Sequence, residues 1–119
     1  MKYVYASKTG HVEKIIGKLG LEAMKITDGS EKTDGDFIIF TYTIGLGKTP
    51  KAVELFLENN KGVKAVVGSG SNSFLHKNTF NFAAENISKQ YNVPILAKLN
   101  GVGTDEEIAA LKAEIEKMQ

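Results

Sequence analysis

The sequence predicts an α/β fold in which a five-stranded parallel sheet lies between two layers of helices. Short segments rich in β-branched and aromatic residues alternate along the chain with segments whose apolar residues recur at helical spacing. Several strand-like segments end in small polar residues and glycine, which is typical of the turn from a strand into a helix. This alternation favours parallel strands, because each crossover helix returns the chain to the same edge of the sheet.

The first part of the chain predicts a strand, a helix and a second, weaker strand. Residues 3–6 form a short apolar run, and a helix is expected over 12–19 because its apolar residues recur at helical spacing. Gly20 is a natural stop for that helix. A weaker strand is expected over 23–26, and the polar stretch 27–36 is expected to be a loop.

The middle of the chain holds the most apolar strand. Residues 37–40 are all aromatic or β-branched, as expected for a parallel strand that is buried on both faces. A helix should begin at Thr49 and Pro50, with Thr49 as the N-cap and Pro50 at the first helical position. Residues 59–62 end that helix.

The last part of the chain predicts two more strand–helix units. A strand is expected over 63–67, a helix over 80–91 and a fifth strand over 93–99. Pro94 lies at the entrance of the last strand, where a missing N–H donor does least harm. Thr104 opens the final helix as part of a capping box.

Length and composition narrow the possible functions. The 119 residues suffice for one domain, residues 1–119, but not for separate cofactor and substrate domains. The chain has no cysteine, so redox chemistry requires a bound cofactor. Fifteen lysines and no arginine give a net charge of +1, which offers no general field for nucleic acid. We expect a phosphate to be held mainly by backbone amides and hydroxyls.

Location and metal binding follow from what the sequence lacks. No run of about 18 apolar residues predicts a membrane helix, and the start shows no leader, so the cytoplasm is the default expectation. His11 and His76 have no carboxylate at ligand spacing, so no metal site is expected.

Three segments combine hydroxyls, glycines and aromatic or apolar side chains directly after a predicted strand. They are residues 7–11, 41–47 and 69–74. In a doubly wound sheet of order 2-1-3-4-5, the first, third and fourth strands lie side by side. The three segments should therefore meet in the crevice beyond the carboxyl ends of the strands, where such folds bind ligands.

The first segment suits a monophosphate. Backbone amides at a helix N-terminus attract an anion, the hydroxyls of Ser7 and Thr9 can donate, and Gly10 allows close approach of the backbone. The alternative is that Ser-Lys-Thr-Gly is only an N-cap turn. The segment is too short for a nucleoside-triphosphate P-loop.

The other two segments suit a flat ring. Gly45 and Gly47 let the main chain run along a ring edge, Tyr42 can stack, and Leu46 can cover the ring or belong to the core. The alternative is a glycine-containing turn before a helix. The third segment offers serines, Asn72 and the aromatic wall of Phe74, although serine and glycine also make plain surface loops.

These motifs resemble the flavodoxin-like NrdI family over nearly the whole chain. Ser7-Lys8-Thr9-Gly10 is similar to that family's phosphate loop, and residues 41–47 with Pro50 are similar to its loop along the flavin. The third loop is similar through Ser69-Gly70 and Phe74, and residues 87–95 with Gly103-Thr104 resemble the C-terminal half.

The resemblance implies a three-layer flavodoxin-like sandwich that binds FMN non-covalently. It implies electrons from a flavodoxin reductase or similar donor, reduction of dioxygen to superoxide, and delivery of this oxidant to NrdF, the dimanganese small subunit of class Ib ribonucleotide reductase. The protein is then a redox activator or electron-transfer protein rather than a conventional enzyme, with no catalytic side chain. The expected cofactor-binding residues are Ser7, Lys8, Thr9, Gly10, His11, Val12, Thr41, Tyr42, Thr43, Gly45, Leu46, Gly47, Ser69, Gly70, Ser71, Asn72 and Phe74.

The sequence departs from the family pattern at several site positions. His11 stands where Asn is usual, Ser71 replaces a frequent Asn, and Phe74 stands where Trp is common. The stretch before the third helix is longer and more basic. Its His76 and Lys77, with Lys48 and Lys51, could form a positive rim around the flavin or simply keep the surface soluble.

Two alternative functions remain for comparison. A generic short-chain flavodoxin would carry single electrons between enzymes without using oxygen. A receiver-like domain would need an acidic cluster at the strand ends, where this chain has Ala6, Ser7, Thr41 and Tyr42, so that alternative is disfavoured.

Overall fold

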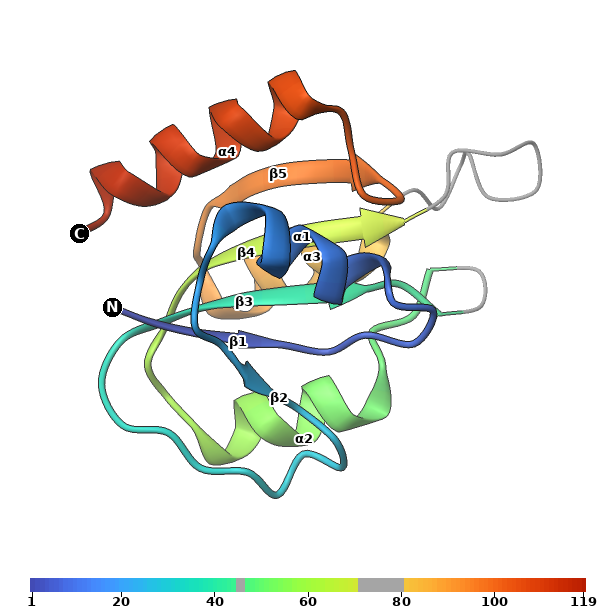
Figure 1. The fold of residues 1–119 in the computed structure, drawn as a ribbon. Helices are drawn as coiled ribbons and strands as arrows, with labels where there is room; N and C mark the ends of the chain where they lie inside the picture. The colour runs from blue at the N-terminus through green and yellow to red at the C-terminus, as the bar shows by residue number, and fades with distance from the viewer. Residues whose placement is uncertain (45–46, 71–80) are drawn as a thin grey trace.

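The computed structural model describes residues 1–44, 47–70 and 81–119 of the chain. Within them, five parallel strands form a sheet in the order β2-β1-β3-β4-β5, as the sequence predicts (Figure 1). The chain order reverses between β1 and β3, which makes that edge the expected ligand site. The strands are β1 (Lys2–Tyr5), β2 (Met24–Lys25), β3 (Phe37–Tyr42), β4 (Val63–Gly70) and β5 (Ile95–Asn100).

Helices cover both faces of this sheet. The apolar side chains of α1 and α4 form one buried cluster with residues such as Phe40, and those of α2 and α3 form a second cluster with residues such as Val66. Successive side chains of a strand point to opposite faces, so β1, β3, β4 and β5 contribute to both clusters, whereas β2 contributes only Met24 to the second. The helices are α1 (His11–Leu19), α2 (Lys51–Asn59), α3 (Phe82–Tyr91) and α4 (Asp105–Lys117).

Strand β3 is the centre of the core. Phe37, Ile38, Ile39 and Phe40 are each at most 1% exposed, which confirms the prediction of a strand buried on both faces. The Phe37 ring meets the ring of Phe56 from α2 edge-on, with centroids 5.5 Å apart and an interplanar angle of 74°. This rigid strand fixes the position of the segment that follows it.

The helix ends agree with the sequence at Gly20 and Thr104 and differ at Thr49. Gly20 ends α1 in the left-handed conformation (φ 69°), and Thr104 forms the predicted capping box with Glu107. The prediction that Thr49 caps α2 is wrong, because Pro50 is the N-cap and the helix starts at Lys51. The Thr49 hydroxyl instead accepts a hydrogen bond from Asn86 Nδ2 of α3 at 3.3 Å.

Strand register brings the polar strand ends together. Tyr42 of β3 lies beside Ser69 of β4, and Gly70 of β4 lies beside Asn100 of β5. The backbone of β1 joins the same edge, since the Ala6 amide donates to the Phe40 carbonyl at 3.0 Å. The segments that leave β1, β3, β4 and β5 therefore start at one edge of the sheet (Figure 1).

Among residues 1–44, 47–70 and 81–119, no helix is long and apolar enough to cross a membrane.

Candidate functional site

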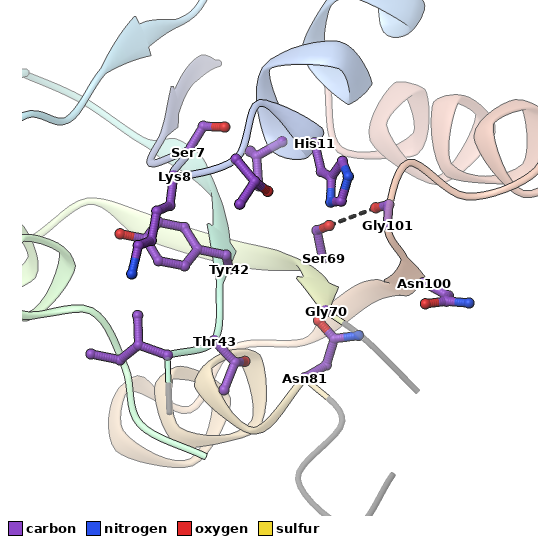
Figure 2. A pocket seen from close by; sticks show the side chains of 13 residues that line it. Ser7, Lys8, His11, Tyr42, Thr43, Ser69, Gly70, Asn81, Asn100 and Gly101 are labelled. Carbon is purple, nitrogen blue, oxygen red and sulfur yellow. Dashed lines mark hydrogen bonds between the residues drawn. The ribbon is translucent and has the colours of Figure 1, made fainter. Parts of the chain in front are cut away.

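A cavity of about 440 Å³ lies at the carboxyl edge of the sheet (Figure 2). This volume is in the range of pockets that bind a small cofactor. The strand ends and the segments after them supply its walls, from β1, β3, β4 and β5. Its described lining residues are Ser7, Lys8, Thr9, His11, Val12, Tyr42, Thr43, Ile44, Ser69, Gly70, Asn81, Asn100 and Gly101.

The first wall is the turn from β1 into α1. Gly10 is the N-cap of α1 and has φ 89°, a conformation that favours glycine, and no side chain caps the helix start. The first amides of α1 thus lack a side-chain acceptor, and they attract anions together with the helix dipole. The Ser7 hydroxyl oxygen is buried and has no hydrogen-bond partner among the residues that the structure describes. These features differ from an ordinary N-cap turn, in which a side-chain oxygen accepts from the helix.

The second wall is the segment that follows β3. Tyr42, Thr43 and Ile44 line the cavity, and in Figure 2 Tyr42 lies with Lys8 on the left of the view. The Thr43 hydroxyl accepts a hydrogen bond from the Ala83 amide at 3.0 Å, which caps the start of α3 from a distant part of the chain. Tyr42 and Ile44 add aromatic and apolar surface, as the wall of a flat ring requires.

The third wall joins the ends of β4 and β5. The Ser69 hydroxyl donates to the Gly101 carbonyl at 2.5 Å, shown as the dashed line in Figure 2. Ser69 is only 3% exposed, so its hydroxyl serves to hold the two strand ends together. Gly70 has no side chain, so its backbone forms this part of the cavity edge. His11, at the start of α1, faces this wall (Figure 2).

Asn81 is a buried member of the site that the sequence did not indicate. It is 1% exposed, has φ 57°, and donates from Nδ2 to the Leu99 carbonyl at 3.2 Å. Within the described ranges, its Oδ1 has no hydrogen-bond partner. The missing Cβ of Gly68 makes room for it, because a Cβ there would lie 2.3 Å from Asn81 Oδ1. The left-handed backbone of Asn81 depends on tertiary packing. Because the sequence predicted a helix over 80–91, it did not indicate that Asn81 would line the site.

Ile44, Asn100 and Gly101 are the other lining residues absent from the prediction. Asn100 is the last residue of β5 and Gly101 follows it, so this pair lies at a strand end as the three predicted segments do. Applying the same reasoning to the fifth strand would have found this polar–glycine pair.

Most predicted site residues that the structure describes lie together, and three do not line the cavity. Thr41 is 0% exposed, and its hydroxyl donates to the Tyr42 carbonyl at 2.9 Å. Gly10 shapes the helix start from outside the lining, and Gly47 lines a neighbouring groove. Five predicted residues lie outside the described residues, namely Gly45, Leu46, Ser71, Asn72 and Phe74.

The charge of the lining favours an anion. Lys8 and His11 contribute cationic or potentially cationic side chains, and the described lining contains no carboxylate. The nearest acid on α1, Glu13, accepts from the Tyr5 hydroxyl at 3.0 Å and pairs with Lys25 at 3.7 Å. Burial and this carboxylate raise the pKa of Tyr5, which keeps the phenol protonated as a donor. Within the described ranges, no three His, Asp or Glu side chains gather as a metal site.

This doubly wound sheet, with its cavity at the switch point, defines a flavodoxin-like protein. Solved structures agree on the fold. A flavodoxin from Streptococcus pneumonia TIGR4 has a TM-score of 0.73 at 23% identity, covering 98% of this chain and 95% of its own. A short-chain flavodoxin associated with a bacterial microcompartment has a TM-score of 0.64 at 16% identity, covering 97% and 93%.

The sequence comparisons are more specific. The family model described as NrdI flavodoxin-like matches residues 3–113. "Protein NrdI" of Bacillus licheniformis is 36% identical over 118 residues, covering 99% of this chain and 89% of the relative. "Protein NrdI" of Ruegeria sp. is 32% identical over 118 residues, covering 92% and 83%. The chain belongs to the NrdI flavodoxin-like family, which implies a flavoprotein tied to ribonucleotide reductase.

Proposed function

We propose that this chain, as one domain, binds FMN in the cavity and serves class Ib ribonucleotide reductase in the cytoplasm. Its partners would be a flavodoxin reductase or similar donor, dioxygen and the small subunit NrdF. The observation that carries the proposal is the cavity itself. Four neighbouring strands end there, with a free helix start on one side and aromatic and apolar surface on the other.

The residues divide into a phosphate end and a ring end. The amides at the start of α1, with the hydroxyls of Ser7 and Thr9, would hold the phosphate. Lys8 would add a positive charge at the same end. Tyr42 and Ile44 would contact the ring, because they supply the flat and apolar surface of the opposite wall.

When bound, FMN would supply the redox chemistry, namely the one-electron reduction of dioxygen to superoxide, the oxidant proposed for assembly of the dimanganese–tyrosyl radical cofactor of NrdF. The protein's contribution is electrostatic. Negative charge beside a flavin disfavours the anionic reduced ring, and the described lining carries none from carboxylates. Lys48 and Lys51 line the adjoining groove, whereas His76 and Lys77 lie outside the described residues.

An absorption spectrum of the purified protein tests FMN binding. We expect flavin bands, and release of FMN rather than FAD or riboflavin on denaturation. Should the protein be colourless, the apoprotein is titrated with FMN and its fluorescence followed. A colourless protein that also fails to bind added FMN would refute the proposal.

A second experiment separates the activator from an electron carrier. The fold neighbours are flavodoxins, so a generic short-chain flavodoxin is the competing function. The reduced protein is mixed with manganese-loaded NrdF and dioxygen, and the tyrosyl radical is measured by electron paramagnetic resonance. Radical formation that superoxide dismutase suppresses supports the activator. Two well-separated one-electron reduction steps, with no radical formed in NrdF, support the carrier.

A further inference from the structure

Two described residues that follow β3, Ile44 and Lys48, pair with each other on the ring side of the cavity. Ile44 and Lys48 form an antiparallel bridge, with the Ile44 amide donating to the Lys48 carbonyl and the Lys48 amide donating back, both at 2.9 Å. The Gly47 amide donates to the Ile44 carbonyl at 3.3 Å. We call the described residues Ile44, Gly47 and Lys48 the 44/48 bridge. Ile44 lines the cavity, so the position of this bridge sets the position of one cavity wall.

Helix α3 contacts the 44/48 bridge through Asn86 and Phe82. Asn86 Nδ2 lies 3.3 Å from the Gly47 carbonyl and 3.3 Å from Thr49 Oγ1, and it donates to both. The Phe82 ring covers Gly47 so closely that a Cβ on Gly47 would lie 2.7 Å from Phe82 Cδ2. Asn86 itself does not line the cavity.

We propose that Asn86 is a positioning residue for the flavin site. It binds no ligand, and it acts through the Gly47 carbonyl and the Thr49 hydroxyl, which together fix the 44/48 bridge and hence Ile44. The proposal rests on the proposed function, because the wall that Asn86 positions is the one assigned to the ring. Asn86 lies 39 residues from Gly47 in the sequence, so no local motif reveals the link.

Helix propensity makes this role distinguishable from a purely structural one. Asparagine is a poor residue for a helix interior, and alanine in its place strengthens an isolated helix. If Asn86 were only a surface residue of α3, Asn86→Ala would stabilise the protein and change nothing else. If it positions the 44/48 bridge, the same substitution loosens the bridge while the global stability stays equal or rises.

Amide hydrogen exchange of the apoprotein measures the bridge directly. In Asn86→Ala we expect the Gly47 and Lys48 amides to exchange about three- to tenfold faster, because one or two exposed hydrogen bonds that hold the bridge are lost. Asn86→Asp should be at least as fast, since a carboxylate cannot donate to the Gly47 carbonyl. The control is Gln90→Ala, one turn along α3 in the same groove, where exchange should be unchanged because the hydrogen bonds from α3 to the described residues Gly47 and Thr49 come from Asn86.

FMN affinity links the bridge to the site. We expect Asn86→Ala to raise the dissociation constant for FMN severalfold and Gln90→Ala to leave it unchanged. Unaltered exchange in Asn86→Ala would overturn the proposal, and so would faster exchange with unaltered FMN affinity. If the wild-type protein bound no FMN, the proposed function would fail, and the exchange rates would still decide separately whether Asn86 holds the bridge.

Discussion

The first and second walls of the cavity, its phosphate side and its ring side, are held in place in different ways. On the phosphate side, residues 7–10 keep hydrogen-bonding groups unused: the first amides of α1 have no side-chain cap, and the Ser7 hydroxyl has no partner. On the ring side, polar groups are already engaged with α3, through Thr43 with Ala83 and Asn86 with Gly47. The first wall therefore offers hydrogen bonds to a ligand, and the second offers a fixed shape.

The largest effect should come from substituting Gly68, because the absence of a Cβ there leaves space for Asn81 at the start of α3. A Cβ at Gly68 would lie 2.3 Å from Asn81 Oδ1 and 3.0 Å from Ala84 Cβ, so Gly68→Ala forces the start of α3 outward. We expect a loss of about 1–3 kcal/mol in unfolding free energy, measured by urea denaturation, and strongly weakened FMN binding.

Gly17→Ala is the matched control for this substitution. Gly17 lies within α1, and a Cβ there meets nothing within 4 Å. The change should raise the unfolding free energy by roughly 0.5–1 kcal/mol and leave FMN affinity unchanged. Equal behaviour of Gly68→Ala and Gly17→Ala would show that α3 does not depend on the space at Gly68.

A smaller effect is expected from removing the unused hydroxyl on the phosphate side. Ser7→Ala should lower FMN affinity at least about tenfold, since a hydrogen bond to a charged phosphate contributes about 1.5–3 kcal/mol. Riboflavin, which has no phosphate, should bind the variant and the wild type equally. Stability should not fall, because the hydroxyl has no partner to lose. Equal FMN affinity of the two proteins would remove Ser7 from the phosphate site.

Alanine substitutions at two glycines distinguish the effect of backbone strain on stability from an effect on FMN affinity. Gly10 (φ 89°) and Gly20 (φ 69°) bound α1, and a Cβ at either would meet nothing within 4 Å. Gly10→Ala and Gly20→Ala should each cost about 1 kcal/mol of stability, from the left-handed backbone alone. Only Gly10→Ala should also raise the FMN dissociation constant, by a few-fold. An equal effect of both variants on affinity would argue against a phosphate at the helix start.

The smallest effect concerns a loop away from both walls. The Glu31 carboxylate accepts from the amides of Thr27, Asp28 and Gly29 at 2.7, 3.3 and 3.0 Å. Burial alone would raise its pKa, but these hydrogen bonds outweigh it and lower the pKa.

The contribution of Glu31 to stability is therefore complete at neutral pH and is lost as the pH falls through its lowered pKa. Glu31→Gln should unfold more readily than the wild type at pH 7, and the difference should shrink on acidification below about pH 4, as followed by thermal denaturation. FMN affinity at pH 7 should be unchanged. A difference that persisted or grew in acid would contradict this assignment.

The sequence predicts the parts of this structure that depend on local pattern. The apolar run 37–40, the glycine that ends α1 and the capping box at Thr104 all indicate their structures within a few residues. Strand order and the meeting of the strand ends then follow from the rules of doubly wound sheets.

The remaining features depend on contacts between distant residues. Thr43 caps a helix 40 positions away, and Thr49 binds Asn86 instead of capping its own helix. Asn81 adopts its left-handed backbone beside Gly68, where the absence of a Cβ leaves room. Among the described residues, the hydrogen-bond partners of these side chains lie 18 to 40 positions away in the sequence, so propensity and periodicity could not place them.

Nuclear magnetic resonance of the ¹⁵N-labelled apoprotein during FMN addition tests most directly where the cofactor binds. The account predicts that the largest amide shifts fall on residues lining the cavity, such as Thr9, His11, Thr43 and Gly101. Riboflavin should shift the ring side while leaving Thr9 and His11 nearly unchanged. Shifts confined to the groove lined by Lys2, Glu22 and Met24 at the opposite edge of the sheet, or no shifts at all, would contradict the account.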